Sequence, residues 1–314
     1  MIKVKLQEEY ARLLLSKDLN ELFTTLNLLT DYIFRLGQAH HSFSPHYYHA
    51  GTMLQMFVTK NISLMKMLTG VGYQASNGSG LNDILDPTTI IPHIRTMYEL
   101  LCTFELVYVL PNTEEKKLIL YNLWCIAGLK NRQAFNNDSM NTEQKEQCED
   151  EAIEIKERIK AIRETTIYNL HNNKKVIEER IDKKDYKLVI DDDNFAKAYG
   201  WKAIPQQINM NKGGVFTETY NYFSMYAHSS YIAAIQFDEM FKERDDVPII
   251  GHMIKNAIIM NSVFISDYMA IFPETKDFFF KQDINLQMAI RVFAKMVRGY
   301  SNDLDEKWMQ ACNA

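Results

Sequence analysis

Apolar residues recur every three or four positions along most of this chain of 314 residues, which is the spacing of one face of an α-helix. In residues 4–36 the pattern predicts two helices, and Gly37 is expected to end the second. The chain has only 12 glycines and 7 prolines, too few for a fold of many short strands and turns. Together these features predict an all-α, multi-helix bundle.

The same periodicity, together with capping residues, predicts the later helices. Asp86-Pro87 is expected to start one helix, and Asn112 to cap another that carries Glu114 and Glu115 in its first turn. The predicted ranges are 45–68, 87–110, 113–129, 217–242, 247–271 and 283–300, followed by a short C-terminal helix.

Two stretches lack this pattern. Residues 69–83 are rich in glycine, serine and asparagine and are expected to form a flexible loop. In residues 182–216, three adjacent aspartates lack the alternating spacing of a calcium-binding loop. Asp193 or Asn194 is therefore expected to cap a helix. The sequence leaves the rest of this second stretch open.

The most charged part of the chain, residues 143–181, predicts a long charged helix with a break near Asn172. Because its heptads are irregular, a solvated connector is the favoured interpretation, and a projecting hairpin and a homodimer seam stay open. Its narrow apolar stripe consists of Ile153, Ile159, Ile162, Ile167 and Leu170. The expected parts of the chain are an N-terminal helical part (1–135), a charged excursion with linker (136–216) and C-terminal helices that complete the same bundle (217–314).

Composition and charge indicate the class of protein and its cellular compartment. With 46% hydrophobic and 24% charged residues, the chain has the composition of a soluble globular protein. A formal net charge of −5 gives no general attraction to nucleic acid or to anionic membranes. The four cysteines form no CxxC pair, which favours a reducing cytosol. The apolar run 249–272 contains Lys255 and Asp267, so a buried helix is preferred over a membrane span, and the predicted location is cytoplasmic.

Polar residues at helical spacing mark a candidate site. Tyr220, Ser224 and His228 follow one another at four-residue steps and lie on one helix face. Arg95 and Glu99 are also four apart, on an otherwise apolar helix, where a buried arginine needs a partner. These five residues are predicted to meet in one polar centre. Two roles stay open for it: a network that fixes helix register, or a site for an anionic small ligand or RNA.

This arrangement resembles a bacterial helical family, domain of unknown function 5677. The family combines Arg-x-x-x-Glu on an early helix, a region with tryptophan, and Tyr-x-x-x-Ser-x-x-x-His on a later helix. The matching residues, within 50–235, are Arg95, Glu99, Trp201, Tyr220, Ser224 and His228. The family has no assigned activity to carry over. The resemblance implies a helical bundle, a polar centre and a bacterial, cytosolic setting.

Two functions stay open. The favoured one is a non-enzymatic binding or interaction module with a role in bacterial defence or stress response. The alternative is a metal-independent, ribonuclease-like effector. In it His228 would act as general base and Arg95, paired with Glu99, would stabilise the anion.

The other histidines give weaker signals of a catalytic or metal-binding site. The Arg-x4-6-His motif of HEPN ribonucleases has its only counterpart here in Arg35 with His40 or His41, beside a glycine. A ferritin-like metal site would need Glu-x-x-His, which no histidine of this chain provides. The remaining histidines of this region, His46 and His49, have no carboxylate close in sequence. No metal site and no cofactor is predicted.

Overall fold

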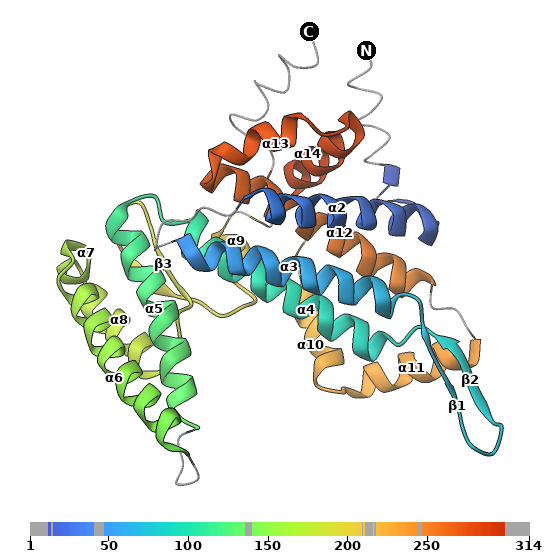
Figure 1. Cartoon of the computed structure of the whole chain (residues 1–314), viewed down its shortest axis with the longest axis horizontal. Helices are drawn as coiled ribbons and strands as arrows, with labels where there is room; N and C mark the ends of the chain where they lie inside the picture. Colours follow the sequence, from blue (N-terminus) through green and yellow to red (C-terminus); the bar gives the residue numbers. More distant parts are fainter. Residues whose placement is uncertain are drawn as a thin grey trace. The chain divides into compact units, whose positions relative to one another are not determined.

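The computed structural model describes residues 12–13, 15–40, 47–135, 140–208, 210, 216, 218–243 and 247–298. Within them the chain is built from helices and two short two-stranded sheets, which confirms the predicted all-α, multi-helix class (Figure 1). It forms two compact units: unit 1 is Met1–Leu101 with Asn209–Ala314, and unit 2 is Cys102–Ile208. The helices predicted before residue 12 and after residue 298 lie outside the described residues.

Unit 1 is centred on α12 (Val247–Ile271), which packs against α2 (Leu19–Ala39) and α14 (Ile284–Arg298). Asp18 caps α2, because its carboxylate accepts hydrogen bonds from the backbone N–H groups of Asn20 and Glu21. The predicted end of α2 at Gly37 is wrong. The helix continues to Ala39, and Gly37 lies inside it, where a Cβ would make an ordinary van der Waals contact of 3.6 Å with Leu54.

Helix α12 is the one helix in the described part of the chain that is long and apolar enough to cross a membrane. However, 78% of its most apolar window is buried within the fold. This burial agrees with the interpretation of residues 249–272 as a buried helix and is compatible with a soluble protein.

The other helices of unit 1 largely follow the predicted ranges. Thr88 N–H donates to the Asp86 carboxylate at the predicted start of α4, whose last three residues belong to unit 2. The predicted helix 217–242 is instead two helices, because Ser229 has a φ of 47° in the left-handed region and the chain turns there. These elements are α3 (Tyr48–Met67), α4 (Pro87–Phe104), α10 (Thr219–Ala227), α11 (Tyr231–Glu243), η4 (Pro273–Thr275) and α13 (Lys276–Phe280).

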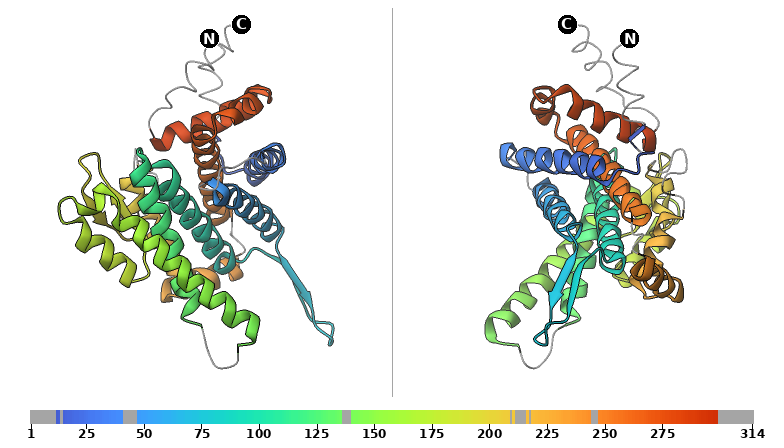
Figure 2. Two further views of the ribbon diagram at one scale, coloured as in Figure 1. Left: turned by 60° about the vertical axis from the view of Figure 1, so that its left-hand side comes forward. Right: turned by 90° about the vertical axis from the view of Figure 1, so that its right-hand side faces the viewer.

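Residues 69–83 are not a flexible loop. Strand β1 (Val71–Gln74) pairs antiparallel with β2 (Gly80–Ile84), and this hairpin extends beyond the ends of α3 and α4 (Figure 2). Gly78 supplies a φ of 85° in the turn, and the Asn77 side chain accepts a hydrogen bond from Ser79 N–H. Turn chemistry therefore orders a stretch whose composition indicated disorder.

In unit 2, α5 packs on α6 through Ile119, Leu123, Ile155 and Ile162, all buried. Ile155 and Ile162 of α6 thus contribute to the core of unit 2, whereas Ile153, the first residue of the predicted stripe, is 55% exposed. The predicted long helix 143–181 is divided into three helices. The predicted break near Asn172 lies between Asn169 and Asn173, and a further break follows Arg163. The elements are η2 (Glu105–Val109, a π-helix), α5 (Glu114–Gln133), α6 (Thr142–Arg163), α7 (Thr166–Asn169), α8 (Asn173–Asp182), β3 (Leu188–Ile190), β4 (Ala196–Ala198) and α9 (Ile204–Gln207).

Two predicted caps in unit 2 are wrong. Thr113, not Asn112, caps α5, because its hydroxyl accepts from Lys116 N–H. No helix starts at Asp193 or Asn194, because β3 and β4 form a hairpin whose turn contains them. The side chain of Asp191 accepts from Phe195 N–H and closes this turn.

Candidate functional site

Arg95 and Glu99 lie one turn apart on α4 and form the predicted ion pair. Nε of Arg95 donates to Oε1 of Glu99 at 3.0 Å. The side chains are 19% and 29% exposed, so the pair is half-buried and reaches the surface of unit 1. A solute can therefore approach the pair.

Tyr220 of α10 joins this pair across 125 residues of sequence. Nη2 of Arg95 donates to the Tyr220 hydroxyl at 2.8 Å, and the guanidinium carbon lies 4.9 Å from the centroid of the tyrosine ring. Aromatic packing brings α10 to α4, because the ring of Tyr98 lies 6.0 Å from that of Tyr220 and 6.2 Å from that of Phe223. The guanidinium is thus held by a carboxylate, a hydroxyl and a ring.

Ser224 and His228 do not complete a five-residue centre. The Ser224 hydroxyl donates to the backbone carbonyl of Tyr220, at 2.7 Å within its own helix. His228 is the C-terminal cap of α10, and its side chain is exposed. The helical stripe ends before His228 because the left-handed Ser229 follows directly. The structure therefore brings Arg95, Glu99 and Tyr220 together and leaves the imidazole of His228 in solvent.

Three residues that the sequence argument missed extend the site. Lys60 of α3 donates through Nζ to the hydroxyl of Thr96 at 2.7 Å. Nε2 of His93 lies 2.8 Å from the backbone carbonyl of Lys60, so this nitrogen carries the proton. We call the six residues the Arg95 cluster: Lys60, His93, Arg95, Thr96, Glu99 and Tyr220.

Burial and charge shift two pKa values in the Arg95 cluster. Burial lowers the pKa of Lys60, and the carboxylate of Glu99 opposes this change. Burial also lowers the pKa of His93; its hydrogen bond to the Lys60 carbonyl opposes the change and the Lys60 charge adds to it. Lys60 is therefore close enough to Glu99 to be influenced by it. Among the described side chains of the cluster, two cations share one carboxylate.

The sequence does contain a signal for two of these three residues, His93 and Thr96. His93 and Thr96 are three apart, and Thr96 and Glu99 are three apart, so the polar face of α4 is wider than Arg95 and Glu99 alone. Lys60 had no such signal. It lies on another helix, in a segment with no polar periodicity of its own.

Arg35 and His40, the two residues that match the HEPN spacing, bind different partners. Arg35 donates to Asp31 at 2.8 Å and to Gln282 at 2.9 Å. The two nitrogens of buried His40 lie 2.8 Å from the Tyr268 hydroxyl and 2.9 Å from a Glu274 oxygen. His40 thus bridges α2 to the end of α12. His41 and His46 lie outside the described residues.

In the described part of the chain, no group of three or more histidine, cysteine, aspartate or glutamate side chains could hold a metal ion. An open, largely apolar groove of about 510 Å³ lies between α2 and α3. Its lining includes Phe23, Phe34 and Met65, and its one carboxylate, Asp31, is paired with Arg35. The groove lacks the convergent polar groups of a catalytic site.

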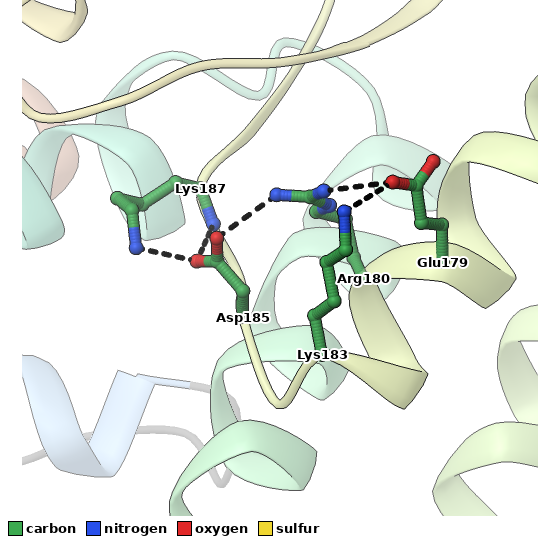
Figure 3. A network of polar contacts seen from close by, with 5 residues as sticks. All are labelled: Glu179, Arg180, Lys183, Asp185 and Lys187. Atoms are coloured by element: carbon green, nitrogen blue, oxygen red, sulfur yellow. Dashed lines mark hydrogen bonds and ion pairs between the residues drawn. The ribbon is translucent and has the colours of Figure 1, made fainter.

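Unit 2 contains a separate ionic network between α8 and β3 (Figure 3). Asp185 accepts from Lys187 at 2.6 Å and from Arg180 at 2.9 Å, while Glu179 accepts from Lys183 at 2.5 Å. Burial acts to raise the pKa of Asp185, but the hydrogen bonds and charge of Lys187 outweigh it and the pKa is lowered. The cations and carboxylates of this network pair with one another, so it stabilises the chain reversal after α8.

The chain matches no family model, no curated protein and no solved structure. Its function is therefore argued from the Arg95 cluster alone.

Proposed function

We propose that this protein is a non-enzymatic binding module that holds an anionic group at the Arg95 cluster. The observation that carries the proposal is the position of two cations near one carboxylate: Arg95 is paired with Glu99 in a half-buried setting, and Lys60, which donates to Thr96, lies close enough for the charge of Glu99 to act on its pKa. A half-buried cation gains more from an anion than an exposed one does, because water screens it less. Burial lowers the pKa of Lys60, so its ammonium group is partly removed from water.

The geometry supports binding better than cleavage. Arg95 is oriented by Glu99 and Tyr220 before any ligand arrives, and preorganisation of this kind favours affinity. The ribonuclease-like alternative needs a general base near Arg95, and its proposed base, His228, is an exposed helix cap. The resemblance through Arg95, Glu99 and Tyr220 is the ground for placing the protein in the bacterial cytosol and in defence or stress response.

The test is calorimetric titration of the whole chain with pyrophosphate and with a short single-stranded RNA. Arg95→Gln and Lys60→Gln should each weaken binding by roughly tenfold or more, because a hydrogen bond to a charged group contributes about 1.5–3 kcal/mol. Arg35→Gln is the matched control, since Arg35 also pairs with a carboxylate four residues away, on an exposed surface. Equal affinity in all four proteins, or no binding by wild type, would contradict the proposal.

Binding and cleavage are separated in the same samples. RNA recovered after incubation should be intact with wild type and with His228→Ala. Cleavage by wild type that His228→Ala abolishes would establish the effector alternative instead.

A further inference from the structure

The β1–β2 hairpin of unit 1 exposes apolar side chains to water. All four residues of β1 are exposed, and three apolar side chains of the hairpin face water: Val71 (56%), Tyr73 (71%) and Leu81 (38%). Tyr73 and Leu81 are direct cross-strand partners, so they lie on the same face. An isolated two-stranded hairpin is marginally stable in water, and a further strand or an apolar cover stabilises it.

The two edges of the hairpin differ. Between the pairs Val71↔Ile84 and Tyr73↔Leu81, β1 contains one residue and β2 contains two, so the bulge lies in β2. Bulges and charged residues keep edge strands from pairing with other chains. Strand β2 has the bulge, and its sequence, Gly-Leu-Asn-Asp-Ile, contains a charged residue. Strand β1, with the sequence Val-Gly-Tyr-Gln, has neither, and no third strand pairs with it in the described residues.

We propose that β1 is a self-association edge, at which two copies of this chain pair through their β1 strands into a four-stranded antiparallel sheet. An interface with two-fold symmetry joins the same surface patch of both copies, so a charged patch meets a patch of like charge. The chain carries a net charge of −5, which makes most faces unfavourable for such pairing. Strand β1 has no charged residue, so this repulsion is absent there.

The arrangement also completes the unpaired edge of the hairpin. Edge pairing supplies backbone hydrogen bonds to β1 and places the Tyr73 and Leu81 faces of both copies on one continuous sheet. The turn keeps the strand in position, since Ala75 N–H donates to the Ser79 carbonyl at 2.7 Å and Gly78 N–H to the Ala75 carbonyl at 3.0 Å. The pairing edge is therefore ordered before association.

Sedimentation of the full chain at roughly 100 µM tests the proposal, since a micromolar Kd gives mostly dimer at that concentration. Wild type should be dimeric. Tyr73→Lys should weaken dimerisation at least about tenfold, because it places a lysine on each of the two paired strands, where like charges repel. Tyr231→Lys is the matched control: Tyr231 is 79% exposed, lies on α11, and undergoes the same change of charge. Far-UV circular dichroism should be the same for all three.

Hydrogen exchange locates the contact. Amides of residues 71–74 should become protected as the wild-type concentration rises, and should not in Tyr73→Lys. A wild-type chain that stays monomeric would overturn the proposal. So would a Tyr73→Lys variant that dimerises like wild type, or a dimer in which β1 amides gain no protection, since each shows that the contact is elsewhere.

Discussion

Arg95 shows what a single residue can reveal before a structure is known. Its pairing with Glu99 follows from local geometry, because residues four apart on a helix are neighbours. Its contact with Tyr220 depends on how α10 packs against α4, yet the stripe of polar positions predicted it correctly. The same stripe predicted wrongly that His228 joins the centre. A single left-handed residue, Ser229, ends the helix there, and no glycine in the sequence marks the position.

His93 leads to a prediction about pH. Burial lowers its pKa below the ordinary value of 6.5, so the unfolded chain binds a proton at a pH where the folded chain does not. Stability is therefore lost as pH falls through 6.5 toward the folded pKa. His93→Gln, which can still donate to the Lys60 carbonyl, should lose less stability than wild type over this window. Urea unfolding at a series of pH values measures the difference.

His228→Gln is the control for this experiment, because that side chain is exposed. It should follow the wild-type curve. If His93→Gln does so as well, burial of His93 does not contribute to the acid sensitivity of the fold.

At the scale of helices and strands, sequence periodicity predicted best where one face is buried over several turns. Helices α2 and α12 are examples, because burial of an apolar stripe is what makes a helix stable in a protein. Both β-hairpins were missed for a physical reason. Strand β1 is exposed on both faces and β3 is buried at all three positions, so neither shows the alternation of a half-buried strand. Their turns depend on single residues such as Gly78 and Asp191.

An amide pair between two helices gives a prediction at this scale. Asn61 of α3 and Asn261 of α12 are fully buried and exchange two hydrogen bonds, at 2.7 and 2.8 Å. Each also donates to a carbonyl of its own helix. Asn61→Leu should lower the free energy of unfolding by about 2 kcal/mol, because it leaves the buried Oδ1 of Asn261 without its donor.

The double variant Asn61→Leu/Asn261→Leu decides whether this loss comes from the unpaired amide. With both polar groups removed, stability should recover above that of either single variant. Denaturant unfolding of the four proteins gives the coupling energy. Additive losses would mean that the two amides do not act as a pair.

At the scale of the whole molecule, the chain separates into two compact units, and the second interrupts the first in sequence. Unit 1 is made of the first and last parts of the chain, and unit 2 is inserted between them. Composition could not reveal this division, because α4 continues from one unit into the other without a linker. Residues 143–181 stand out in the sequence by their charge, but Ile155, Ile162, Ile167 and Ile177 within them are buried in the core of unit 2.

Separate cores predict separate responses to core mutations. Ile162 is fully buried in unit 2, and Ile162→Ala should cost roughly 2–5 kcal/mol through lost contacts and a cavity. Amides of α5, α6 and α8 should then exchange more than about tenfold faster, since each 1.4 kcal/mol is a factor of ten. Amides of α2 and α12 should change far less. Hydrogen exchange followed by mass spectrometry measures both sets in one experiment.

The matched variant is Ile33→Ala, in which an equally buried isoleucine of α2 is truncated in unit 1. Its effect should be the reverse, with faster exchange in α2 and α12 and little change in α5 and α6. If both variants accelerate exchange equally throughout the chain, the two units unfold as one cooperative body. In that case a ligand bound at the Arg95 cluster would stabilise residues 102–208 as much as unit 1, whereas independent units confine that stabilisation to unit 1.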